Sequence, residues 1–115
     1  MKITQLDRVE KRKLVDDELK GVSKQIPVGS ADGAPNFSMR VISVEPGGFT
    51  EYHAHPWEHE TYILKGAGIL MNSAGEETAV KPGDFTLVFP NEKHQFRNTG
   101  SEELQFICLV PKEHE

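Results

Sequence analysis

The chain has 115 residues, with 13 basic and 18 acidic side chains that give a formal net charge of −5. This length suits one domain, so we expect residues 1–115 to form a single unit. The acidic balance disfavours nucleic-acid binding, which needs a basic surplus. No apolar run is long enough for a membrane span, so no membrane association is expected. The single cysteine cannot close an intramolecular disulfide, which predicts a reducing, cytoplasmic location.

The N-terminal part, residues 1–35, is interpreted as an arm preceding the main body of the domain. Within it, the charged stretch 9–20 is compatible with a short helical turn or with an edge strand and loop. The segment 21–28 is predicted to be a long strand.

Short segments rich in β-branched and aromatic residues alternate with glycine, proline and asparagine turns through the rest of the chain. The clearest predicted strands are 39–44, 61–64, 85–89 and 104–110. Short strands with frequent turns predict an all-β sandwich or barrel. The long segments 21–28 and 104–110 could also pair with a second subunit, because an uncovered strand edge invites pairing.

Four histidines are placed to meet in space: His53, His55 and His59 within seven positions, and His94 further along. On one strand His53 and His55 would share a face, with Cβ atoms about 7 Å apart. Pro56 favours a turn, after which the chain can return with His59 beside the first pair. If His94 begins a strand on the opposing sheet, four imidazoles converge as donors for a divalent transition metal.

The residues around the first three histidines resemble the first motif of the cupin family. Gly47, His53, His55, His59 and Gly66 keep its spacing, with His59 at the position that normally holds glutamate. The run from residue 53 to 60, His-Ala-His-Pro-Trp-Glu-His-Glu, is similar to that of small single-domain cupins with four metal-binding histidines.

The second cupin motif is matched around His94. Gly83, Pro90, His94 and Asn98 follow its pattern, although the proline is displaced by one position. Asn91 replaces the usual glycine, and asparagine is the next-best residue for a left-handed backbone conformation. The two motifs together cover residues 47–98.

The resemblance implies a jelly-roll β-barrel, usually a homodimer, with His53, His55, His59 and His94 as metal ligands. The family also places a glutamate shortly after the second histidine, which makes Glu60 the alternative ligand. His59 and Glu60 would point to opposite sides of a strand. Imidazole ligands suit Cu, Ni, Zn or Fe, and the family includes Mn members, so the metal's identity stays open.

Strand alternation also nominates residues that line the expected cavity. His94 and Phe96 share a face of the second-motif strand, and Phe106 and Cys108 share a face of the last strand. For Phe106 and Cys108, ordinary core packing is the preferred interpretation, and a role in the cavity wall is the alternative. Arg40 lies in an otherwise apolar strand, where it can meet an anionic substrate in the cavity or pair with an acidic residue at the surface.

The histidine set predicts a metal-dependent oxidoreductase, dioxygenase-like, that acts on a small organic substrate. Two alternatives stay open: a redox-silent metal acting as Lewis acid in an isomerase or decarboxylase, or a non-catalytic protein that binds or senses a small molecule or metal. The fifth histidine, His114, lies in a charged tail and is expected to be solvated.

Overall fold

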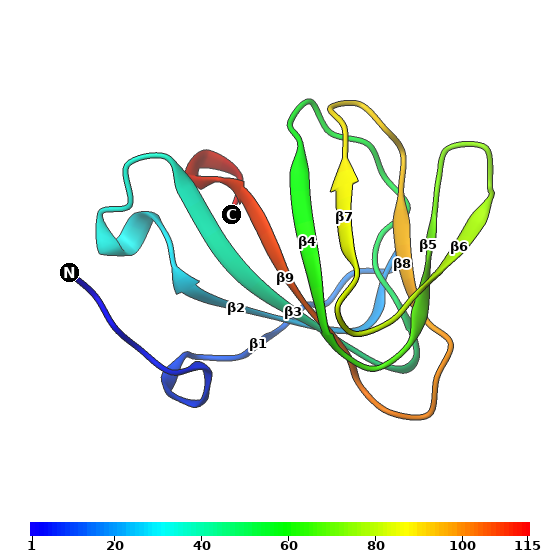
Figure 1. The fold of residues 1–115 in the computed structure, drawn as a ribbon, viewed down its shortest axis with the longest axis horizontal. Helices are drawn as coiled ribbons and strands as arrows, with labels where there is room; N and C mark the ends of the chain where they lie inside the picture. Colours follow the sequence, from blue (N-terminus) through cyan, green and yellow to red (C-terminus); the bar gives the residue numbers. More distant parts are fainter.

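The protein is built on one curled, fully antiparallel sheet, seen in a computed structural model that describes all residues from Met1 to Glu115 (Figure 1). The strands are β1 (Arg12–Lys13), β2 (Lys20–Val28), β3 (Phe37–Phe49), β4 (His59–Lys65), β5 (Gly68–Met71), β6 (Glu77–Val80), β7 (Phe85–Val88), β8 (Gln95–Asn98) and β9 (Leu104–Pro111). Three short 3-10 helices span Leu6–Arg8, Ser30–Asp32 and Lys112–His114. None of these helices has the length or the apolar character needed to cross a membrane.

The strand order is β6-β5-β8-β3-β9-β4-β7, with β2 paired to β3 and β1 paired to β2. Strands far apart in sequence are therefore neighbours, as in a jelly-roll barrel, and the all-β prediction is confirmed. In Figure 1, strands β4 to β8 stand together at one end of the molecule, while the N-terminus lies at the other end beside β2. Because the sheet is curled, one of its faces is concave, and this concave inner face encloses the interior of the protein.

The inner face carries the hydrophobic core because strand alternation sends every second side chain inward. Val44, Ile63 and Leu104 are completely buried there. Phe96 from β8 and Phe106 from β9 stack with ring centroids 4.3 Å apart, which joins two strands that do not pair directly. Burial of two such rings is worth several kcal/mol, about 1.5–3 kcal/mol for each side chain.

The predicted strands all exist, and β3 and β4 extend at both ends beyond the segments that were predicted. The segment 39–44 lies within β3, 61–64 within β4, and 104–110 within β9, while 85–89 corresponds to β7 without its last residue. The charged stretch 9–20 contains β1 and a turn, so the strand-and-loop alternative is the correct one.

The expected role of segment 104–110 as an arm for a second subunit is wrong. Along its length β9 is hydrogen-bonded to β3 on one side and to β4 on the other. Both of its edges are therefore satisfied within the chain, and no donors or acceptors are left for another strand. The free edges of the sheet belong instead to β6, to β7 and to β1, which covers the outer edge of β2 only at Ser23 and Lys24.

The turn before β8 depends on the backbone conformation of Asn91. This residue is the one non-glycine with a positive φ, at 66°. Its backbone N–H donates to the carbonyl of His55 over 2.7 Å. The asparagine that replaces the motif glycine thus keeps the left-handed turn and ties the second motif to the first.

Candidate metal centre

The four motif histidines are brought together by backbone pairing between distant segments. His53 and His55 lie between β3 and β4, His59 is the first residue of β4, and His94 directly precedes β8. His53 and His94 form an isolated antiparallel bridge with reciprocal N–H···O contacts of 3.2 and 3.0 Å. This bridge holds residues 41 positions apart in sequence at one point of the barrel interior.

The conformation of the first motif differs from the one expected. The sequence predicted a strand that carries His53 and His55 on one face, but β3 ends at Phe49 and β4 begins at His59. Only His53 makes a strand-like bridge, and the chain bends around Pro56. Because a proline has no N–H, this segment cannot continue a ladder, and the two imidazoles converge through the bend.

The imidazole rings form a compact cluster. Ring centroids are 4.6 Å apart for His59 and His94, and 5.1–5.2 Å apart for four further pairs among the histidines. One ring nitrogen each from His53, His55 and His94 lies within 4.8 Å of the other two. That group of three does not include His59. With metal–nitrogen distances of about 2.0–2.1 Å, ligand nitrogens of one ion lie about 3–4 Å apart, so this spacing is close to that of a coordination sphere.

Hydrogen bonds to backbone carbonyls fix which nitrogen of two rings carries the proton. His55 Nδ1 lies 2.8 Å from the carbonyl oxygen of Trp57, and His94 Nδ1 lies 2.7 Å from that of Glu92. A carbonyl oxygen only accepts, so each Nδ1 is the donor and each Nε2 keeps its lone pair. A neutral imidazole with a free Nε2 is the form that binds a metal.

Two ring nitrogens of the histidine cluster are buried and make no hydrogen bond. His59 is 6% exposed and His94 is 3% exposed, and the Nε2 atom of each makes no hydrogen bond. A buried polar atom without a partner costs about 1–3 kcal/mol, and native structures contain few of them. The donor set, two orphaned Nε2 atoms within a cluster of neutral imidazoles, fits a divalent transition metal.

The interior keeps the rings uncharged. Burial is the main cause that lowers the pKa of His59 to about 3, with the neighbouring His94 adding to the effect. Burial likewise lowers the pKa of His55 and of His94, against the opposing effect of their carbonyl contacts. Near neutral pH these three rings therefore have the lone pairs that ligation requires.

Cys108 connects His59 to a charged side chain. Its Sγ lies 3.0 Å from His59 Nδ1 and accepts a hydrogen bond from Arg40 Nη2 at 2.8 Å. Arg40 and Cys108 are directly opposite each other on β3 and β9, so both point to the inner face. Burial raises the pKa of the Cys108 thiol, and Arg40 opposes that rise.

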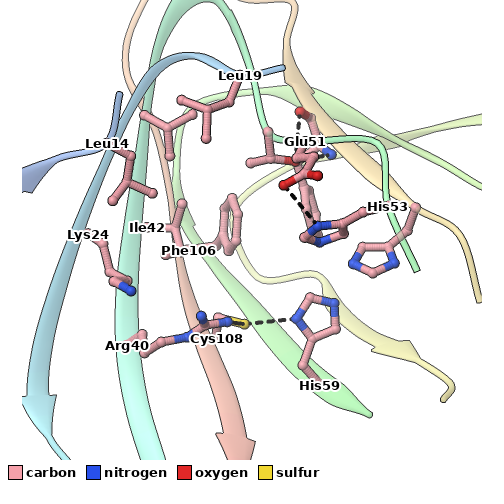
Figure 2. A pocket seen from close by; sticks show the side chains of 14 residues that line it. Leu14, Leu19, Lys24, Arg40, Ile42, Glu51, His53, His59, Phe106 and Cys108 are labelled. Carbon is pink, nitrogen blue, oxygen red and sulfur yellow. Dashed lines mark hydrogen bonds and ion pairs between the residues drawn. The ribbon is translucent and has the colours of Figure 1, made fainter. Parts of the chain in front are cut away.

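A cavity of about 180 Å³ opens beside the histidines (Figure 2). All four predicted cavity residues, Arg40, Phe96, Phe106 and Cys108, line it. Its remaining lining residues come from the N-terminal segment, the inner sheet face and the first motif: Leu14, Leu19, Val22, Lys24, Ile42, Thr50, Glu51, His53, His59 and His94. The cavity is therefore mostly apolar, with its charged groups confined to a few positions.

Sequence reasoning missed Glu51 and Lys24, which both line this cavity. Glu51 Oε2 lies 3.3 Å from His53 Nδ1, a contact that orients the imidazole. Glu51 lies two positions before His53, and this spacing was the available signal. Lys24 is a lysine at an inward position of β2, which only the register of the sheet identifies.

Glu60, the alternative ligand, is exposed on β4 next to the buried His59. It lines a separate surface depression with Phe37 and Glu58. Partial burial raises the pKa of the Glu60 carboxyl, and so does Glu58, to which a protonated Glu60 would donate a hydrogen bond. Glu60 thus lies away from the cavity that His59 lines.

The tail histidine is not merely solvated. The ring of Trp57 stacks on His55 with centroids 4.4 Å apart, and on His114 with centroids 3.6 Å apart. Trp57 is the only tryptophan of the chain, so its fluorescence can report on events at His55.

The chain is similar to known proteins of one family. A family model described as Cupin domain matches residues 40–110. The oxalate-binding protein of Thermotoga maritima is 31% identical over 70 residues, which are 60% of this chain and 57% of that protein. The 1-methylthio-D-xylulose 5-phosphate methylsulfurylase of Rhodospirillum rubrum is 35% identical over 77 residues, 67% of this chain and 49% of that protein.

The similarity extends to solved structures. The polyketide cyclase RemF of Streptomyces resistomycificus superposes with a TM-score of 0.90 at 28% identity, over 96% of this chain and 79% of that one. The chain spans about half the length of the curated relatives it matches. Their printed activities differ from one another, so the fold by itself does not select a reaction.

The buried histidines predict an acid-sensitive fold in the metal-free protein. Because the folded-state pKa of His59 lies below its ordinary value of 6.5, the unfolded chain binds more protons between these values. Stability is therefore complete above pH 6.5 and is lost as the pH falls, by up to about 1.4 kcal/mol per pH unit for each such group. Urea denaturation of chelator-treated protein from pH 7 to pH 5 measures this loss.

One variant assigns this effect to His59. His59→Gln should reduce the slope of stability against pH, because it removes the ring whose pKa is lowered to about 3. A wild-type stability that stays flat over this pH range would contradict a buried, neutral His59.

Proposed function

The chain belongs to the cupin domain family, and on this basis we propose that His53, His55, His59 and His94 bind one divalent transition metal. The observation that carries the proposal is the pair of buried Nε2 atoms, on His59 and His94, that have no partner. Their lone pairs lie within a cluster of neutral rings, where a cation is the one partner that would satisfy several of them together.

Each proposed ligand is oriented by another group. Backbone carbonyls hold Nδ1 of His55 and His94, the Glu51 carboxylate holds His53, and Cys108 Sγ contacts His59. Such contacts commonly raise the basicity of a ligating imidazole and fix its orientation. His59 is preferred to Glu60 as the fourth ligand because Glu60 is exposed outside the cavity.

We further propose that the centre serves a metal-dependent oxidoreductase of the dioxygenase type. A redox-active ion such as Mn, Fe, Cu or Ni would supply one-electron and oxygen chemistry to a small organic substrate in the cavity. The protein's part is to bind that substrate against apolar walls such as Phe96 and Phe106, and to exclude water there. No histidine of the cluster is left over to move protons, which favours oxidation over proton transfer.

A second reaction class is supported by Glu51. Its carboxylate lines the cavity and could accept a substrate proton at Oε1 or Oε2, while its contact with His53 holds it in place. A redox-silent ion such as Zn would then polarise the substrate as a Lewis acid in an isomerase or decarboxylase. A non-catalytic binding role is the outcome if neither reaction occurs.

Metal content tests the ligand set. Wild-type protein is expected to bind one equivalent of metal, and His59→Ala or His94→Ala should weaken that binding by more than the about 10–100-fold typical of losing an outer partner. Glu60→Ala serves as the matched control, because its side chain is exposed outside the cavity. Calorimetric titration, with Trp57 fluorescence as a second readout, measures the affinities. Loss of binding in Glu60→Ala with retention in His59→Ala would reassign the fourth ligand.

Oxygen consumption tests the reaction class. Protein loaded with Mn, Fe, Cu or Ni should consume O₂ in the presence of a suitable phenolic or keto-acid substrate, whereas Zn-loaded protein should not. Turnover by the Zn form without oxygen uptake would favour the Lewis-acid reaction instead. Tight ligand binding without turnover for every metal would remove the enzyme proposal.

We also propose that the protein is a homodimer formed through the outer face of the sheet near β7. Phe85, Leu87 and Phe89 are 80%, 45% and 59% exposed, on and just after an edge strand. On the neighbouring β4 and β9, Tyr62 and Ile107 continue the same face. Contiguous exposed apolar surface of this kind is typical of subunit interfaces, and a second copy offers the same surface in return.

Light scattering coupled to gel filtration tests this arrangement. The wild type is expected to elute as a dimer, and Phe85→Lys, opposite Tyr62, as a monomer, because the substitution buries a charge in the proposed interface. Thr78→Lys, at an exposed position on the opposite edge strand β6, is the matched control and should stay dimeric. A monomeric wild type at high protein concentration would contradict the proposal.

A further inference from the structure

The cavity beside the histidines has a cationic end. Figure 2 shows Lys24 and Arg40 together on one side of the cavity, and His53 and His59 on the other. Ile42 and Phe106 lie between the two ends and form an apolar wall. The cavity therefore offers two positive charges at a distance from the imidazole cluster.

The sheet register explains why these two cations share the inner face. Lys24 on β2 is directly opposite Ile42 on β3, and Arg40 lies two residues before Ile42 on the same strand. Lys24 and Arg40 are thus diagonal neighbours, a spacing within reach of long side chains. Two like charges on one inner face repel each other, so the arrangement destabilises the fold unless something compensates for it.

No carboxylate compensates for this pair. Neither cation takes part in any ion pair of the structure, and the buried Nε of Arg40 has no hydrogen-bond partner, although its Nη2 is held by Cys108. The acidic group that most affects Lys24 is Glu115, whose carboxylate is already bonded to Ser30 and Ser38. Burial, and then the charge of Arg40, lower the pKa of Lys24. Both side chains are half-buried, and a half-buried charge without an opposite charge beside it is unfavourable.

We propose that Arg40 and Lys24 form a subsite for the carboxylate of a small organic acid, whose other end reaches the histidine cluster. This inference rests on the proposed metal site and names the substrate class for it. The free Arg40 Nε and the Lys24 ammonium would donate charge-assisted hydrogen bonds to the carboxylate. Ile42 and Phe106 would contact the apolar part of the acid.

The size of the cavity restricts the acid. At about 180 Å³ it is smaller than the about 300–1,000 Å³ of sites for drug-sized ligands. A compact acid with a single short apolar portion is the class that the volume and the lining select.

Calorimetric titration of Zn-loaded protein with pairs of ligands that match in shape and differ in charge tests the proposal. Benzoate and propionate should bind, and benzamide and propionamide should bind at least about tenfold more weakly, because the amides cannot neutralise the two cations. Inorganic phosphate is the probe for the other common anion. Equal binding of acid and amide, preference for phosphate over both carboxylates, or no saturable carboxylate binding would each overturn the proposal.

Variants assign the effect to the two side chains. Arg40→Gln and Lys24→Gln should each weaken benzoate binding about 10- to 100-fold while the zinc stoichiometry stays at that of the wild type. Arg97→Gln and Lys20→Gln are matched controls, because Arg97 pairs with Glu77 at 3.4 Å on the outside and Lys20 is exposed at the start of the same strand as Lys24. Unchanged benzoate affinity in both cavity variants would refute the subsite.

Two further measurements keep the outcome interpretable. Arg40→Lys should retain most of the benzoate affinity even if Arg40→Gln folds poorly, because it keeps the charge. If the wild type takes up no metal, the metal site fails, and titration of the metal-free protein with benzoate and benzamide still decides whether the cationic subsite exists. Binding of benzoate by that metal-free protein, with loss in Lys24→Gln, would support the subsite alone.

Discussion

The reciprocal backbone contact between His53 and His94 is the constraint on which the site depends. It joins a segment that follows β3 to the start of β8, at a place where the sheet curls back on itself. The Asn91 N–H that bonds to His55 adds a second link between the same two segments. Both links are made by the backbone, so they hold the two histidine-bearing segments together whatever rotamers the side chains adopt. An ion would then meet a cluster that is already organised, which lowers the entropic cost of binding it.

The chemistry of the interior follows from its low polarity. Desolvation keeps the three buried or half-buried rings neutral, and it also disfavours the charge of Lys24. The two ends of the cavity therefore differ in charge. One end has imidazole lone pairs that no cation contacts, and the other has cationic side chains that no anion contacts. A metal at the first and a carboxylate at the second would satisfy both. Cys108 lies between them, in contact with His59 and with Arg40.

Much of this arrangement could be predicted from the sequence, and the parts that could not have a common cause. Alternation and turn residues identified most of the strands, although the short strands β1, β5 and β6 were not predicted, and the motif spacing identified the histidines, because those signals are local. Asn91 was correctly predicted to replace a glycine for the same reason. The interior position of β9 depends on which strands pair over long distances, and no local pattern determines that. Lys24 was missed because its inward direction is set by its register against Ile42, and the strand-like geometry expected for His55 was replaced by a bend.

X-ray absorption spectroscopy of the Zn-loaded protein tests the central claim, that imidazole nitrogens hold the ion, most directly. The account predicts a first shell of nitrogen and oxygen at about 2.0–2.1 Å, with the outer-shell scattering that several imidazole rings produce. It also predicts no sulfur at about 2.3 Å, since Cys108 is assigned to orient His59 and not to bind the metal. A spectrum without imidazole scattering, or with a zinc–sulfur distance, would contradict the account.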